Sequence, residues 1–131
     1  MVYKWDVTIP KLSGDSPRRA YLWLPEDYEE NPDKRYPVMY MFDGHNVFFD
    51  EDATYGKSWG MGAYMDETNT RMMIVAVECN HSPDNGRLSE YSPFTFQDPR
   101  FGRIVGRGRE TMDWLLHTLK PLIDRQYPAL P

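Results

Sequence analysis

Two short, continuous runs of apolar residues constrain the fold of this chain more than any other feature. The first covers residues 37–42 (PVMYMF) and the second covers residues 72–79 (MMIVAVEC). Unbroken apolar runs of this length are typical of strands buried on both faces, as in a parallel sheet. Between them, Ser58 is a candidate N-cap for a helix that reaches about Glu67. The two runs therefore predict a β-α-β unit within an α/β sheet.

Two further strands are predicted ahead of the first apolar run. Apolar and polar residues alternate from Tyr3 to Ile9 and again from Arg19 to Leu24, which is the pattern of half-buried strands. The proline-containing stretches 10–17 and 25–36 are predicted as exposed connections. The early strands therefore form one side of a sheet with mixed strand directions.

The second half of the chain begins with a long irregular stretch and ends in a helix. Prolines and glycines interrupt residues 80–108, which predicts a loop that is functional or partly structured. Apolar residues at helical spacing predict a helix over 110–127, and Pro121 predicts a kink near His117. The apolar stripe consists of Met112, Leu115, Leu116, Leu119, Leu122 and Ile123. The expected order is β-β-β-α-β-loop-α in a single domain over residues 1–131.

Charge and hydropathy exclude several classes of partner. The net charge is -5 and no long basic run is present, so nucleic acid is not expected as a partner. No run of about 18 apolar residues is present, so no membrane span is expected. The first ten residues lack the apolar core of a signal peptide, which favours a cytoplasmic location, although a leader removed earlier would leave no trace here. Aromatic residues make up 15% of the chain, which suits either a heavy core or a ligand pocket.

Residues 56–60 (GKSWG) match the G-x-S-x-G pattern of a serine nucleophile. That pattern needs a strand directly before the serine, so that a sharp turn exposes the hydroxyl. Residues 51–55 are polar and predict no such strand. A helix cap is therefore favoured for Ser58, and a nucleophile on an unfamiliar small fold is kept as an alternative.

Cys79 is the only cysteine, so the chain forms no internal disulfide. Its place at the end of an apolar run favours a buried structural thiol over a reactive one. Cys79 and His81 alone are a weak signal for a metal, because a zinc site takes at least three protein ligands. No metal and no other cofactor are therefore expected.

The turn after the first apolar run, residues 43–46 (DGHN), is a candidate site. In α/β-hydrolase sheets the loop after the third strand supplies a backbone N–H to the oxyanion hole. Acyl transfer places negative charge on the carbonyl oxygen, and a fixed N–H stabilises that charge. Gly44 permits a sharp turn of the backbone. An ordinary turn at the end of a strand explains the same spacing, so both interpretations stay open at this point.

Three segments together resemble the putative-esterase family of α/β-hydrolases, which includes esterase D-like, feruloyl and enterochelin esterase-like enzymes and the mycolyltransferases. They are PVMYMFDGHNVF, the strand IVAVECN with a loop ending in RLSEYSPF, and LKPLIDRQYP. The resemblance runs from about Arg18 to the end. It implies the N-terminal half of an α/β-hydrolase mixed sheet, ending before the nucleophile elbow. It also implies carboxylic-ester hydrolysis with a Ser-Asp/Glu-His triad outside this chain, so that the chain alone is inactive.

The resemblance also assigns candidate site residues. His45 matches the position whose backbone N–H contributes to the oxyanion hole, and this favours the catalytic interpretation of the turn. Positions near the substrate pocket or its supporting loop are matched by Gly44, Asn46, Trp59, Asn80 and Arg87. His45, His81 and His117 all precede the expected place of the catalytic base, because the triad follows the order Ser, acid, His in this fold. From the residues alone, Arg87 and Glu90 could form an ion pair that orders the loop beside the pocket, with a surface pair that contributes little as the alternative.

Two classes of function remain. In the first, the chain is part of a serine esterase and binds a small-molecule ester, with a carbohydrate-linked or siderophore-type ester implied by resemblance only. In the second, it is a non-catalytic binding or assembly module, in which Tyr91, Phe94 and Phe96 contact a ligand or partner. In both, the strand over 37–42 would be an exposed apolar edge. We expect the missing C-terminal half, or another copy of the chain, to cover it.

Overall fold

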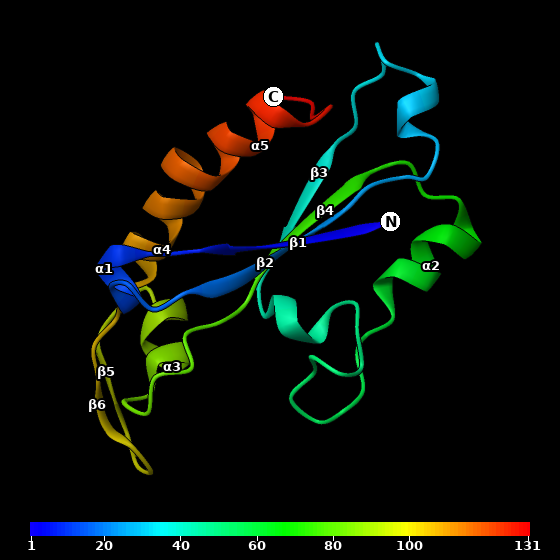
Figure 1. The fold of residues 1–131 in the computed structure, drawn as a ribbon. Helices are drawn as coiled ribbons and strands as arrows, with labels where there is room; N and C mark the ends of the chain where they lie inside the picture. The colour runs from blue at the N-terminus through cyan, green and yellow to red at the C-terminus, as the bar shows by residue number, and fades with distance from the viewer.

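The two apolar runs form neighbouring parallel strands, β3 (Val38–Met41) and β4 (Met73–Val77). The computed structural model describes all 131 residues and places these strands in a four-stranded mixed sheet (Figure 1). Their register pairs Val38 with Met73 and Met41 with Ala76. The predicted α/β class and the parallel pair are therefore confirmed.

The two alternating segments form the antiparallel side of the sheet. Strand β1 (Val2–Val7) pairs with β2 (Arg18–Trp23), and β2 pairs with β4, which gives the order β1-β2-β4-β3. The connections predicted as loops each contain one short turn of helix, α1 (Pro10–Ser13) and η1 (Tyr28–Glu30).

Helices cover both faces of the sheet (Figure 1). On one face lie α4 (Gly108–Trp114), a π-helical segment (Leu115–Leu119) and α5 (Lys120–Gln126). The core on this face contains Leu22, Leu24, Tyr36, Met73, Val75, Leu119, Ile123 and Ala129. On the other face lie the 3-10 turn η2 (Gly44–Asn46) and α2 (Met61–Thr68). Its core contains Tyr21, Trp23, Val47, Met65, Ile74 and Ala76.

The kink predicted near His117 occurs as the π-helical segment that precedes Pro121. Proline has no N–H to donate to the carbonyl four residues earlier, so the helix adopts a wider turn at this point. The predicted apolar stripe is only partly buried, since Leu119 and Ile123 lie in the core while Met112 and Leu116 are exposed. The stripe is therefore wider than the face of the helix that contacts the sheet.

The helix between the parallel strands begins later than expected. It starts at Met61, and Gly60 precedes it with a left-handed backbone (φ 65°). The Gly60 N–H donates to Ser58 Oγ at 3.2 Å. Ser58 therefore stabilises the turn ahead of the helix, and its assignment as the N-cap was wrong.

The stretch predicted as one long loop contains regular structure. It includes α3 (Gly86–Tyr91) and a hairpin of β5 (Phe96–Asp98) and β6 (Gly102–Ile104). The segment that resembles the family's pocket loop is thus a helix beside the end of β4 (Figure 1).

Strand β3 is the edge of the sheet, and β4 is its only neighbouring strand. Met39 is 39% exposed, so the prediction that this strand is buried on both faces was wrong for the described chain. Just before β3, Tyr36 forms a parallel bridge with Ala129. The Tyr36 N–H donates to the Pro128 carbonyl at 2.8 Å, and the Leu130 N–H donates to the Tyr36 carbonyl at 2.8 Å. Residues 128–130 thus lie beside the residue that precedes β3, while β3 itself has no strand on its open side.

None of the helices has both the length and the apolar composition that a membrane-spanning segment requires.

Candidate functional site

The turn after β3 lies against the backbone of β4. Asp43 adopts a left-handed conformation (φ 54°), and η2 follows it. A Cβ atom on Gly44 would lie 2.8 Å from the Ala76 carbonyl carbon and 2.9 Å from the Val77 backbone. Real Cβ atoms do not approach backbone this closely, so only glycine permits the contact. The glycine therefore sets the position of the next residue, His45, relative to the sheet.

Asp43 is fixed by two side chains of α3. Arg87 donates from Nε to Oδ1 at 3.0 Å and from Nη2 to Oδ2 at 2.6 Å, which is a bidentate pair. Tyr91 Oη donates to Oδ1 at 3.3 Å and accepts from the Asp43 N–H at 3.3 Å. Burial alone would raise the pKa of Asp43, but the hydrogen bonds and charge of Arg87 lower it below its usual value. The turn therefore has a permanent anionic anchor.

His45 is buried, with 6% of its surface exposed. Its ring Nε2 lies 3.1 Å from Thr54 Oγ1, and its Nδ1 has no hydrogen-bond partner. Burial and the neighbouring His81 lower the pKa of His45. The backbone N–H of the next residue, Asn46, donates to the Asp43 carbonyl, which makes the first bond of the 3-10 turn. The His45 N–H precedes this bond, so it has no partner within the turn. An N–H at the start of a 3-10 turn, without a partner in that turn, is suited to an external oxygen.

Asn46 and Trp59 close the loop that follows the turn. Asn46 Oδ1 accepts from the Thr54 N–H at 3.0 Å, and the Asn46 carbonyl accepts from the Trp59 N–H at 2.8 Å. The Trp59 side chain is 55% exposed. The structure thus places Asn46 and Trp59, two of the predicted pocket residues, in one loop with His45. The backbone of each is hydrogen-bonded within the protein.

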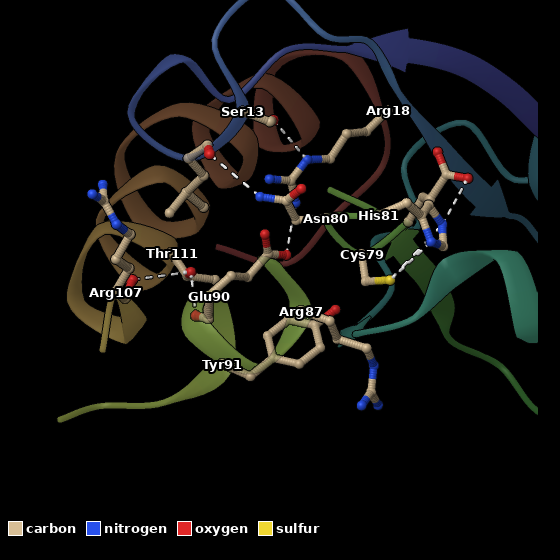
Figure 2. A network of polar contacts seen from close by, with 12 residues as sticks. Ser13, Arg18, Cys79, Asn80, His81, Arg87, Glu90, Tyr91, Arg107 and Thr111 are labelled. Carbon is tan, nitrogen blue, oxygen red and sulfur yellow. Dashed lines mark hydrogen bonds and ion pairs between the residues drawn. The ribbon is translucent and has the colours of Figure 1, made fainter. Parts of the chain in front are cut away.

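Asn80 is buried beyond the end of β4 (Figure 2). Its Nδ2 donates to the Leu12 carbonyl at 3.3 Å, and its Oδ1 accepts from the Ser82 N–H at 3.0 Å. A Cβ on Gly86 would lie 2.5 Å from the Asn80 side chain, so α3 begins in close contact with it. The amide of Asn80 therefore has internal partners at both ends and stabilises the loop.

The prediction of an ion pair between Arg87 and Glu90 was wrong. Glu90 instead pairs with Arg18 of β2, from Nη1 to Oε1 at 2.7 Å, and both side chains are 3% exposed (Figure 2). Thr111 Oγ1 donates to the Glu90 carbonyl at 2.6 Å and links α4 to α3. Residues 87 and 90 lie on different sides of α3, so one contacts the turn and the other contacts the sheet. Sequence spacing alone gave no signal for the pair with Arg18, which is 72 residues away.

Cys79 is buried, as predicted for a structural thiol, and burial raises its pKa to about 11. His81 lies beside it, with Nδ1 at 3.6 Å from Sγ (Figure 2). The rings of His81 and His45 are 4.8 Å apart in an edge-to-face arrangement. The sequence gave no sign that His45 joins this group, because the contact depends on the pairing of β3 with β4.

A family model described as "Putative esterase" matches residues 13–131. The chain belongs to the putative esterase family. A search of curated proteins gives no significant match.

Solved structures of hydrolases share the fold. An IroE-like serine hydrolase from Shewanella oneidensis is 18% identical, with a TM-score of 0.67 over 98% of this chain and 39% of that one. The siderophore hydrolase EstA from Aspergillus nidulans is 13% identical, with a TM-score of 0.64 over 97% and 44%. A ferulic acid esterase from Anaeromyces mucronatus, solved with ferulic acid, is 18% identical, with a TM-score of 0.52 over 99% and 44%. The chain therefore spans less than half the length of each of these three structures.

Proposed function

We propose that residues 1–131 are the N-terminal part of a serine carboxyl-ester hydrolase and that they supply one backbone donor, the His45 N–H, to its oxyanion hole. The observation that carries this proposal is the place of the His45 N–H at the start of the 3-10 turn η2, where it has no partner within the turn and where the geometry is fixed from three sides. Gly44 contacts the β4 backbone, Arg87 anchors Asp43, and Thr54 contacts the buried ring. A donor whose direction is fixed before the reaction stabilises a developing oxyanion without reorganisation.

The nucleophile, the acid and the base of the triad are proposed to lie outside these residues. Support comes from residues 128–130, which lie parallel to the start of β3 on its open side. A strand continuing in this direction would pair with β3 and end near the His45 turn. In the family that the sequence resembles, the neighbouring strand carries the nucleophile. The domain over 1–131 is therefore proposed as one partial α/β-hydrolase domain.

Part of the substrate pocket is proposed to lie beside the same turn. An open hollow of about 480 Å³ is lined by Phe42, at the end of β3, and by residues of α3 and α4. The Phe42 and Tyr91 rings are 4.7 Å apart and form an aromatic wall. Among the related structures, one is described as a siderophore hydrolase and one as a ferulic acid esterase. We propose a small ester as the substrate class for this chain too, with Trp59 and Arg87 at the rim of the site.

The proposal is tested by two substitutions at position 45 that both remove the imidazole, of which only one also removes the backbone N–H. Proline at position 45 has no N–H and breaks no bond within η2, because residue 45 lies in the first turn of that helix, whereas alanine retains the N–H. In the full polypeptide that contains residues 1–131, His45→Pro should lower kcat for p-nitrophenyl acetate about 10²–10³-fold relative to His45→Ala. Circular dichroism must show that both variants are folded.

Two controls complete the test. Ser58→Ala should leave activity near the wild-type value, because Ser58 contributes to a turn ahead of α2 and not to an elbow. Loss of activity in Ser58→Ala, with an intact fold, would support the alternative nucleophile. Equal kcat values for His45→Pro and His45→Ala would exclude His45 as an oxyanion donor.

A further inference from the structure

Three side chains that commonly bind metals meet at the sheet end that carries the His45 turn. His45 comes from the turn after β3, while Cys79 and His81 come from the loop after β4. One ligand atom from each residue lies within 4.8 Å of the others. The three residues converge because β3 and β4 are parallel neighbours, so that both strands end at the same edge.

The polar partners of the two imidazoles are those of metal-binding histidines. His45 Nε2 is 3.1 Å from Thr54 Oγ1, and His81 Nε2 is 3.3 Å from Glu78 Oε2. Histidine ligands usually direct their second ring nitrogen to an oxygen of this kind, which fixes the tautomer and the ring orientation. In both residues the Nε2 interaction leaves Nδ1 free to act as a ligand.

The His45 Nδ1 atom gives a second, independent indication. It is buried and has no hydrogen-bond partner, on a side chain that is 94% buried. A buried polar atom without a partner destabilises a fold, and native structures have few of them. A cation bound between His45, Cys79 and His81 would satisfy this atom.

We propose that His45, Cys79 and His81 bind one Zn²⁺ ion, with a water molecule as the fourth ligand. A thiolate with two imidazoles is a soft donor set that favours Zn²⁺ over Mg²⁺ and Ca²⁺. Binding converts the Cys79 thiol to a thiolate and releases its proton to solvent.

The geometry is close to that of a tetrahedral site. Ligand atoms around Zn²⁺ lie roughly 3.3–3.6 Å apart, given the usual Zn–N and Zn–S bond lengths. Cys79 Sγ and His81 Nδ1 are already 3.6 Å apart. Since no separation exceeds 4.8 Å, side-chain shifts of about 1 Å complete the site. An open hollow of about 370 Å³, lined in part by Cys79 and His81, gives access to the ion and its water.

The ion would connect the ends of two strands. It would link the turn after β3 to the loop after β4 and so restrict motion of the backbone at residues 44–46. This inference does not depend on esterase activity, because the ligands are side chains whereas the proposed oxyanion donor is a backbone N–H.

Metal binding to the purified full chain tests the proposal directly. The protein is first treated with a chelator and then titrated with Co²⁺, which should give a thiolate-to-cobalt charge-transfer band in the absorption spectrum. One equivalent of Zn²⁺ should displace the Co²⁺ and abolish the band. We expect a Zn²⁺ dissociation constant of about 1 µM or tighter by calorimetry, and no comparable binding of Mg²⁺. Hydrogen exchange at residues 44–46 should slow when Zn²⁺ is added.

Variants assign the ligands. Cys79→Ser should abolish the charge-transfer band, His81→Ala should greatly weaken Zn²⁺ binding, and Thr54→Val should weaken it about 10–100-fold through loss of the outer hydrogen bond. The matched control is His117→Ala, because His117 is exposed on the helix far along the chain from the cluster. Circular dichroism of each variant distinguishes loss of the site from loss of the fold. Zn²⁺ binding that is absent in the wild type, or unchanged in folded Cys79→Ser and His81→Ala, would overturn the proposal.

Discussion

Arg87 and Asp43 form a bidentate ion pair that connects α3 to the turn after β3, with atom separations of 3.0 and 2.6 Å. Asp43 has a left-handed backbone, so the pair stabilises a conformation that a residue with a side chain adopts only at some cost in free energy. Arg87→Ala should therefore lower the free energy of unfolding by about 1 kcal/mol, since Arg87 is partly exposed and the pair is partly screened. Urea denaturation followed by circular dichroism measures the change.

Two variants show whether the forked geometry matters in this pair. Arg87→Lys keeps the charge but loses the paired donors, and its stability should lie between the wild type and Arg87→Ala. Arg100→Ala removes a more exposed arginine from its pair with Asp98 and should change stability by less than about 0.5 kcal/mol. An equal effect of Arg87→Ala and Arg100→Ala would mean that the pair contributes nothing to the turn.

Gly44 and Gly62 differ in the space around them and give a matched pair of substitutions. Gly44→Ala places a Cβ 2.8 Å from the Ala76 carbonyl carbon and should destabilise the fold by about 2 kcal/mol or more, because the backbone of β4 must move. Around Gly62, inside α2, the nearest atoms are 3.8 Å away, so Gly62→Ala should be neutral or stabilise by up to about 1 kcal/mol. Thermal unfolding compares the two. Similar midpoints for both variants would contradict the close packing of the turn on β4.

Arg18 and Glu90 are both almost fully buried, and the loss of either charge leaves the other without an oppositely charged partner. Arg18→Met should lower stability by about 3–5 kcal/mol. Burial raises the pKa of Glu90, and Arg18 opposes that rise. Without Arg18 the pKa rises further, so the variant should gain stability as the pH falls and Glu90 takes up a proton.

The double variant separates the pair from its surroundings. Arg18→Met with Glu90→Leu removes both charges and should recover a large part of the lost stability, since buried pairs are often replaceable by apolar side chains. Urea denaturation of the wild type, the two single variants and the double variant completes the thermodynamic cycle. An additive result would mean that Arg18 and Glu90 do not interact.

Local sequence patterns predicted the strands well and the contacts between distant segments poorly. The apolar runs at 37–42 and 72–79 correctly indicated a parallel pair, because continuous hydrophobicity is a local property. The burial of β3 was overestimated, because burial depends on which strand lies beside it. Ser58 was misplaced as a cap by two residues, since Gly60 adopts the left-handed backbone that starts α2.

The same distinction applies to the candidate site. The position of the His45 turn after the third strand followed from the element order and the family resemblance. Its contacts with Arg87 and His81 join segments that are far apart in the sequence, and nothing in the local pattern indicates them. The prediction of an Arg87–Glu90 pair failed for the same reason. A spacing of three residues suggests a contact along a helix, but it does not exclude better partners in distant segments.

Asp52 gives a pH dependence of stability. Burial alone would raise its pKa, but hydrogen bonds from Lys4 and Tyr21 lower it below the usual value. A carboxyl group with a lowered pKa in the folded state contributes stability above its unfolded pKa of about 3.9, and this stability is lost as the pH falls through the folded value. Asp52→Asn should therefore flatten the fall in unfolding free energy below about pH 4. Asp15→Asn, an exposed side chain without a hydrogen bond, is the control, and an equal effect of both variants would exclude this role for Asp52.

A substitution on β3 tests whether another copy of residues 1–131 or a later strand of the same polypeptide covers the open side of this strand. Met39 is 39% exposed there, and the backbone of β3 has no neighbour beyond it. If copies of residues 1–131 associate through this edge, Met39→Lys should shift the sedimentation coefficient of that fragment toward the monomer, because a charged edge opposes strand pairing. If later strands of the same polypeptide cover β3, Met39→Lys should instead lower the stability of the full polypeptide by about 2 kcal/mol or more through burial of a charge. Tyr55→Lys is the control, since Tyr55 is 95% exposed away from the strand. An unchanged sedimentation coefficient together with unchanged stability would mean that neither another copy nor a later strand contacts β3.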